Sequence, residues 1–384
     1  MSWKYMEAMA EYLIKLEDFP IILSTLLKEK IVDKIIGAQL RVDKKSGETD
    51  RFTVQPKLVE KEEDLKDFPL SPLIAFGYAR TDSASKFLHK SVEGAMNEKV
   101  GLIARPCDTR ALIELAKIRQ VKLDNLFVIG IEDRGMLPKA GREMRKIKDV
   151  DATKIVKEKV GDKGLIVMMD DGSIKELNLT VAENCSRCYR KIPIVADLTV
   201  SDLGIPIDSG EIILKVYSDK GSDVLEKSGI NKKSLPDKIK KTHSDKYDEI
   251  IEKAKEKRAK DLEEWNKLSQ EEKMAELLKC TMCNTCIRGC PVCYCVDCIL
   301  MKKRKDKTID KATYQLTRIA HDADRCVECG NCDNNCPQNL PLSLYFQSLN
   351  EAFKEKFNYE AGMSLEDIPF RSGKAISQME LEKT

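Results

Sequence analysis

Cys280-Thr-Met-Cys283-Asn-Thr-Cys286-Ile-Arg-Gly-Cys290-Pro291 is the stretch that decides the fold of the C-terminal half of this chain. Its spacing, C-x2-C-x2-C-x3-C-P, returns at Cys326-Val-Glu-Cys329-Gly-Asn-Cys332-Asp-Asn-Asn-Cys336-Pro337. Three thiolates spaced in this way hold one cubane iron–sulfur cluster, and in two-cluster ferredoxins the fourth ligates the other cluster. We therefore expect two [4Fe–4S] clusters, one on Cys280, Cys283, Cys286 and Cys336 and the other on Cys326, Cys329, Cys332 and Cys290.

A zinc site is the alternative reading of these cysteines. Zinc also uses C-x2-C pairs, but it closes with four tetrahedral ligands that usually come as two separated pairs. Two complete four-cysteine sets, each followed by a proline, fit iron–sulfur clusters better.

Six further cysteines have no partner among these eight. We expect Cys107, Cys185 and Cys188 to ligate a third [4Fe–4S] cluster, with a fourth ligand from Asp108 or from the group formed by Cys293, Cys295 and Cys298. The alternative is that some of the six are buried free thiols, which pack as small hydrophobic side chains. His321 precedes the second motif and is either structural or a hydrogen-bonding neighbour that tunes a cluster.

Length, composition and charge argue against several other classes of protein. The 384 residues exceed the size of one compact domain, and 66 basic against 64 acidic residues leave no global excess of positive charge for nucleic acid. Glu7 and Glu11 interrupt any signal peptide, and no apolar run approaches the roughly 18 residues of a membrane span. We expect a cytoplasmic protein with no membrane span, in which reduced thiols bind metal.

The fold class predicted is an α/β N-terminal domain, then a helical linker and a C-terminal ferredoxin-like iron–sulfur domain. The boundaries are 1–235, 236–275 for the charged linker, 276–345 for the iron–sulfur domain and 346–384 for a tail. Residues 100–104, 109–119 and 126–131 read as strand, helix and strand of a βαβ unit, and 165–177 as a β-hairpin. Residues 9–36 carry helical spacing with a break at Pro20, and 211–217 reads as a strand.

The turn after the first strand of the βαβ unit is the place where ligands collect in open α/β sheets. Asp108, Thr109 and Arg110 lie there and are candidate cofactor contacts, with Arg110 suited to a phosphate or carboxylate. The alternative for each is an ordinary residue of a helix N-terminus, serving as a cap or a surface charge.

Several segments, taken together and in order, resemble the beta subunit family of coenzyme F420-dependent hydrogenases and formate dehydrogenases. They are Pro106-Cys107-Asp108, residues 111–131, Glu183-Asn-Cys-Ser-Arg-Cys188, Ala196-Asp-Leu198 and the two cysteine motifs with Cys293-Tyr-Cys295 between them. The resemblance implies an iron–sulfur flavoprotein subunit. FAD would exchange a hydride with coenzyme F420, and the clusters would carry single electrons to a partner subunit.

The implied partner belongs to a hydrogenase, formate dehydrogenase or heterodisulfide reductase complex of an anaerobe. No residue reads as an independent catalytic group, so turnover is expected to need other subunits. A variant of this reading is a flavin-free electron conduit or adaptor, because Leu16-Glu-Asp-Phe19-Pro20 stands where similar proteins have glycines. A different class is a structural or redox-sensing iron–sulfur protein.

Overall fold

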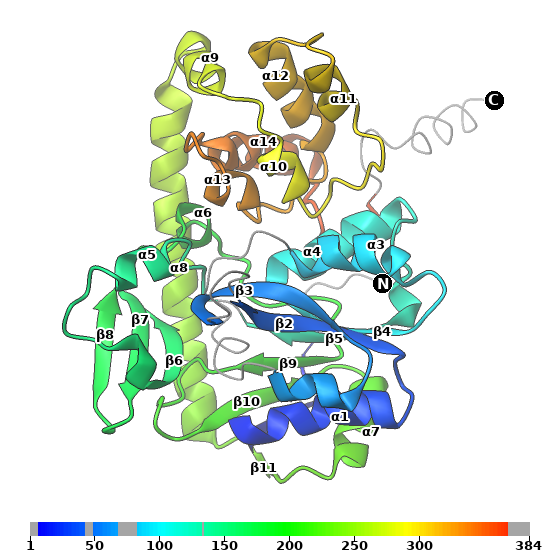
Figure 1. Ribbon diagram of the computed structural model, residues 1–384, viewed down its shortest axis with the longest axis vertical. Coiled ribbons are helices and arrows are strands. Elements are labelled where there is room, and N and C mark those ends of the chain that lie inside the picture. Colours follow the sequence, from blue (N-terminus) through cyan, green and yellow to red (C-terminus); the bar gives the residue numbers. More distant parts are fainter. Residues whose placement is uncertain (1–6, 43–48, 68–82, 133, 368–384) are drawn as a thin grey trace.

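The computed structural model describes residues 7–42, 49–67, 83–132 and 134–367 (Figure 1). An α/β part carries a mixed sheet with helices, and a helical, cysteine-rich part follows it. One long helix, α8, runs alongside both parts. No helix in the described ranges combines the length and apolarity needed to cross a bilayer. All 14 cysteines lie in these ranges, and none forms a disulfide.

The main sheet has eight strands. Pairing is parallel for β2 with β4, β4 with β5 and β5 with β9, and antiparallel for the other neighbours. The order across the sheet is β11 (Lys232–Ser234), β1 (Ala10–Lys15), β10 (Glu211–Val216), β9 (Leu198–Ser201), β5 (Leu126–Ile131), β4 (Val100–Ala104), β2 (Lys34–Val42) and β3 (Thr49–Val59). A separate antiparallel sheet contains β6 (Ile155–Gly161), β7 (Gly164–Met169) and β8 (Ile174–Asn178).

The predicted βαβ unit is confirmed as β4, α4 (Pro106–Lys117) and β5, with β4 and β5 parallel. Every residue of both strands is buried, because helices cover both faces of the sheet. On β4, Ile103 joins the core that holds α1 (Phe19–Lys28) and α7 (Asp219–Ser228). Its neighbours Leu102 and Ala104 join the core under α3 (Ala84–Ser91) and α4. The hairpin predicted at 165–177 and the strand predicted at 211–217 are also confirmed.

The helical prediction for residues 9–36 is wrong at both ends. The segment forms β1, a short 3-10 turn, α1 and the start of β2, and Pro20 lies in the first turn of α1, where proline is well accommodated. Strand β1 lies between β10 and β11 and is buried at both Leu13 and Ile14, on opposite faces. A short apolar run buried on both sides does not alternate, so its spacing does not distinguish strand from helix.

The cysteine-rich part consists of helices and loops in the described residues, after the 31-residue α8 (Asp237–Lys267), which is about 46 Å long. The predicted linker is therefore helical, but a stripe of it is packed: Ala254, Arg258, Leu262 and Trp265 are buried. The helices that follow are α9 (Gln270–Leu278), α10 (Thr285–Arg288), α11 (Ile299–Lys305), α12 (Lys311–Asp322), α13 (Asn331–Asn334) and α14 (Leu342–Phe357). Helix α14 runs across the boundary predicted at residue 345, because Leu342 and Phe346 belong to the core of this part.

Glu132, at the end of β5, joins three elements. Its carboxylate accepts from Lys215 of β10 at 2.8 Å and contacts the His243 ring of α8 at 2.6 Å. Burial alone would raise the pKa of Glu132, but the hydrogen bond from His243 and the charge of Lys215 lower it to about 2. This carboxylate therefore helps to fix the near end of α8 to the sheet, together with the ion pair of Lys240 with Glu11 of β1.

Glu132→Gln tests this anchor. The pKa of Glu132 falls from an ordinary 4.5 to about 2 on folding, so its contribution to stability is complete above about pH 4.5 and is lost as the pH falls toward 2. We expect the variant to lose about 3 kcal/mol of unfolding free energy at pH 7 and to show a flatter acid profile. Urea unfolding followed by fluorescence measures both. The exposed Glu226→Gln is the control, and an equal loss there would contradict the assignment.

Candidate functional site

The two cysteine motifs fold in the same way. In each, the residue before the second cysteine (Met282, Glu328) and the residue after it (Asn284, Gly330) have positive φ angles of 53°, 57°, 68° and 69°. This loop turns the backbone N–H of Met282 toward Cys280 Sγ at 3.1 Å and that of Glu328 toward Cys326 Sγ at 3.4 Å. Such N–H groups stabilise a thiolate and tune the potential of a bound cluster.

The first cavity of the cysteine-rich part has a volume of about 300 Å³. Four of the side chains that line it are Cys280, Cys283, Cys286 and Cys336. Side-chain polar groups reach the sulfurs as well, since Gln315 Nε2 donates to Cys280 Sγ at 2.8 Å and the Thr285 hydroxyl lies 3.2 Å from Cys283 Sγ. The structure therefore brings together the first set of four thiols, including the one from the far motif.

The second cavity has a volume of about 340 Å³, and the second set of four thiols lines it: Cys290, Cys326, Cys329 and Cys332. Burial raises the pKa of Cys326, Cys329 and Cys332, so each thiol has to lose a proton to become a ligand. The exchange of the fourth cysteine between the two motifs is thus present in the geometry of the two cavities.

A single metal ion draws its ligands closer together than these sets. Tetrahedral zinc with Zn–S bonds of about 2.3 Å places the sulfurs about 3.8 Å apart. Among the described residues, the only group of three or more potential ligand atoms within 4.8 Å of one another is Cys290, Cys293 and Asp322. The two four-cysteine sets are more widely spaced, as a multinuclear cluster requires.

The α/β part presents its own cysteines to the second motif. Cys107 lies in the first turn of α4, close enough to Cys329 to add to the effect of burial in raising its pKa. Cys185 lies on α6 (Glu183–Ser186), and Asn184 beside it donates to the Cys329 carbonyl at 3.0 Å and to Cys185 Sγ at 3.6 Å. Cys188 Sγ lies 3.6 Å from the Arg190 carbonyl.

The three cysteines between the motifs face a different cavity, although Cys293 also packs beside Cys290. Cys293, Cys295 and Cys298 line a third cavity together with His321, which is exposed. Cys293 also lies 3.4 Å from Asp322 Oδ2, and a hydrogen bond between the Cys290 and Cys293 thiols lowers the pKa of Cys290. The tuning role predicted for His321 stays a prediction.

Of the three candidate contacts on α4, only Arg110 has donors to spare. Both oxygens of Asp108 are occupied, by the Ala84 N–H at 2.9 Å and the Arg105 N–H at 3.2 Å. The Thr109 hydroxyl donates to the Pro106 carbonyl and accepts from the Ile194 N–H. Asp108 and Thr109 therefore hold the local backbone in place, as the alternative reading allowed.

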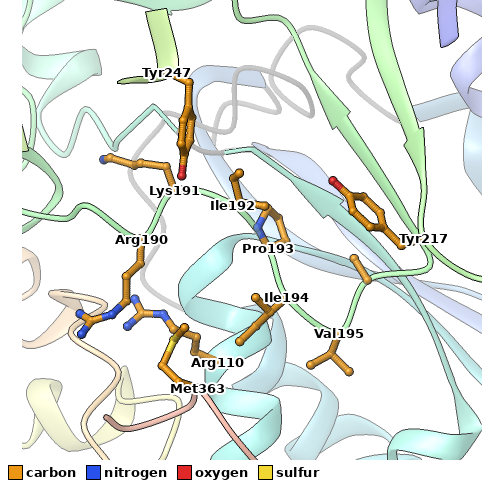
Figure 2. Close-up of a pocket in the computed structure, with 11 residues that line it drawn as sticks. Arg110, Arg190, Lys191, Ile192, Pro193, Ile194, Val195, Tyr217, Tyr247 and Met363 are labelled. Atoms are coloured by element: carbon orange, nitrogen blue, oxygen red, sulfur yellow. The ribbon is translucent and has the colours of Figure 1, made fainter. Parts of the chain in front are cut away.

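Arg110 lines a cavity of about 710 Å³ (Figure 2). Its side chain is 3% exposed, and its Nε and Nη2 have no hydrogen-bond partner in the part of the chain that the structure describes. Figure 2 shows Arg110 beside Arg190, with Lys191 and Tyr247 on another wall. Strands β4 and β5 end nearby, since Pro193 of this cavity packs against Gly130 of β5. A buried guanidinium with free donors fits a phosphate or carboxylate.

Two residues of this region were missed by the sequence analysis. Glu328 is fully buried, and its carboxylate pairs with Arg258 at 2.8 and 2.9 Å and with Arg190 at 3.3 Å. Burial opposes the charge, but the two guanidinium groups lower the pKa of Glu328 to about 2. Asn184 is the second. Both adjoin predicted ligands in the sequence, and that position is the only signal that could have suggested them.

The chain is similar to several known proteins. A family model described as the C terminus of the coenzyme F420 hydrogenase/dehydrogenase beta subunit matches residues 97–235. The F420-dependent formate dehydrogenase subunit beta of Methanocaldococcus jannaschii is 28% identical over 362 residues, 88% of this chain and 89% of that protein. The F420-dependent formate dehydrogenase 1 subunit beta of Methanococcus maripaludis is 31% identical over 312 residues, 74% of this chain and 79% of that protein.

One solved structure is also similar. A chain of the F420-reducing [NiFe] hydrogenase complex from Methanosarcina barkeri aligns with a TM-score of 0.48 and 14% identity, covering 67% of this chain and 92% of that one.

Gly330→Ala tests the contact between the second motif and Asn184. A Cβ at Gly330 would lie 1.9 to 2.2 Å from the Asn184 side-chain amide, and φ is +69°. We expect a loss of about 2 to 4 kcal/mol of stability from overpacking and backbone strain. Thermal unfolding under anaerobic conditions measures it.

The matched control is Gly229→Ala, where φ is +62° and an added Cβ would meet nothing within 4 Å. The double variant Gly330→Ala/Asn184→Ala should recover part of the lost stability, because the clash with the Asn184 side chain is removed. Equal damage in the double variant would show that Asn184 is not the obstacle.

Proposed function

The chain belongs to the beta subunit family of coenzyme F420 hydrogenases and dehydrogenases, and from this premise we propose that it is the electron-transfer subunit of such a redox complex. The observation that carries the proposal is the pair of cavities, each lined by four thiols drawn from both cysteine motifs. Two relatives are named as beta subunits of F420-dependent formate dehydrogenases, which favours that complex over others.

Two [4Fe–4S] clusters are proposed for these cavities. Such clusters pass single electrons. The residues of this chain hold the eight thiolates and direct N–H groups at them, from Met282, Glu328 and Gln315. The fold of this part is proposed to be of the two-cluster ferredoxin type, with Arg318 buried beside both sets through its contact with the Cys286 carbonyl and its place in the second cavity.

A third cluster is proposed on Cys107, Cys185 and Cys188. The oxygens of Asp108 are taken, so the fourth ligand is sought in the Cys293–Cys298 group. Cys293 is favoured because it packs with Ala111, which lies one turn after Cys107 on α4. Asn184 would connect this centre to the second set through its two hydrogen bonds.

The proposal also includes the binding of FAD and a reaction with coenzyme F420. A flavin would supply the exchange between a hydride and single electrons. The cavity of Arg110 has free guanidinium donors that could hold a phosphate or carboxylate of such a molecule. Arg190 beside it is engaged by Glu328 and Glu360, so Arg110 is the residue proposed to bind the anion.

A flavin-free conduit is the second candidate, and one observation favours it. Phe19 is fully buried in the main core, and the resemblance described above implies glycines at its place. A bulky core side chain there excludes a close approach of a cofactor to the backbone. In either form full turnover is proposed to need other subunits, and the partner is a catalytic subunit of hydrogenase, formate dehydrogenase or heterodisulfide reductase type.

These alternatives are tested on protein purified without oxygen. The measured quantities are the iron, the acid-labile sulfide and the extracted flavin per chain. About twelve irons with one flavin is the result expected for three clusters and direct F420 chemistry. About eight irons without flavin would leave the conduit form and contradict the flavin form. Iron near one per chain, with no sulfide, would contradict both.

Cys336→Ala separates the two ferredoxin-type clusters. Cys336 lies in the second motif but lines the first cavity, so we expect the variant to lose about four irons from the first cluster and to keep the second. Electron paramagnetic resonance of the reduced protein should then show one spin system fewer. Cys290→Ala is the reciprocal variant, and Thr281→Ala is the control with intact ligands. Loss of the second cluster in Cys336→Ala would contradict the exchange of ligands.

A further inference from the structure

A third cavity of the cysteine-rich part, about 1,320 Å³ in volume, is separate from the Arg110 cavity. Helix α3 of the α/β part contributes Lys86 and Lys90 to it, and the loop between the cysteine motifs contributes Tyr294. Helix α12 and the residues after it supply His321 and Arg325.

The charge of this lining is strongly unbalanced. Five cationic side chains face one carboxylate, Asp322, and that carboxylate is already paired with Arg318. Lys86 is 6% exposed, and no described residue forms a hydrogen bond or an ion pair with its ammonium group. The Nε of Arg325 is buried without a hydrogen-bond acceptor in the described residues, and its ion-pair partner Asp324 lies 3.8 Å away, outside the lining. Cationic groups with spare donors form charge-assisted hydrogen bonds with an anion, so this lining favours an anionic ligand.

The rest of the lining is apolar or aromatic. Val292 and Leu300 are buried, and the Arg325 guanidinium lies 5.6 Å from the centre of the Tyr294 ring. Lys90 and Arg288 are exposed at the mouth. Ligand sites of this kind combine an apolar wall with a few polar groups that fix orientation. The complementary molecule has an apolar or aromatic body and carries a phosphate or carboxylate group.

We infer that this cavity binds a small anionic molecule of that class, with Lys86 and Arg325 at the anionic group and Tyr294 against the body. Arg318 and Asp322 line both this cavity and the second four-cysteine cavity. The bound molecule would therefore lie one layer of side chains from the second proposed cluster. The binding itself does not depend on the proposed electron transfer, and the two can fail separately.

Binding of 1-anilinonaphthalene-8-sulfonate to the anaerobically purified holoprotein tests the inference, because this probe combines an aromatic body with an anionic group. We expect saturable binding, displacement by inorganic pyrophosphate, and at least tenfold weaker binding of the uncharged analogue N-phenyl-1-naphthylamine. Lys86→Met should weaken probe binding about tenfold. Lys303 is exposed and does not line the cavity, so Lys303→Met removes a charge and should leave binding unchanged.

Arg325→Gln is the second variant and keeps the test decisive if Lys86→Met does not fold. Iron content and dithionite-reducible absorbance are measured on the same samples, so that loss of clusters is distinguished from loss of the ligand. Unchanged probe affinity in a folded Lys86→Met or Arg325→Gln protein, or equal affinity for the uncharged analogue, would overturn the inference. Normal clusters in that case would leave the proposed function standing.

Discussion

The buried carboxylate of Glu328 is the interaction on which the assembly of the two parts depends. It lies inside the second cysteine motif, accepts two hydrogen bonds from Arg258 of α8, pairs with Arg190 of the α/β part and accepts from Asn350 of α14 at 2.8 Å. An uncompensated charge at a fully buried position costs several kcal/mol, so none of these elements can move away alone. The loop that holds the proposed second cluster is thereby fixed to the sheet and to the long helix at once.

The two motifs have the same backbone conformation but contact different parts of the molecule. Asn284 of the first motif accepts from the Tyr314 hydroxyl, within the cysteine-rich part. Gly330 holds the same place in the second motif and lacks a side chain, which leaves room for Asn184. The second loop is therefore the one that meets the α/β part. With clusters bound as proposed, the second cluster would lie between the Cys107–Cys188 centre and the first cluster.

Two cavities have cationic linings, although the chain as a whole is almost neutral. The formal charge of +2 hides the buried Arg110 and Lys86, each without a described partner for its free donors. In both places the backbone and neighbouring carboxylates are engaged elsewhere, so the cation is left facing a cavity. Such sites arise from the way distant segments meet, since Lys86 comes from α3 and Arg325 from the loop after α12.

The sequence by itself determined what depends on short spacing along the chain. The grouping of the cysteines within each motif follows from loop geometry that a few residues fix, and the βαβ unit follows from its buried, continuously apolar strands. Tertiary structure alone decided that residues 10–15 form a strand, that α8 packs along both parts, and that Arg110 has free donors while Asp108 and Thr109 do not. It also decided the roles of Glu328 and Asn184. The physical reason is that each of these outcomes depends on partners far away in the sequence, such as Cys329, 145 residues after Asn184, and local spacing carries no record of them.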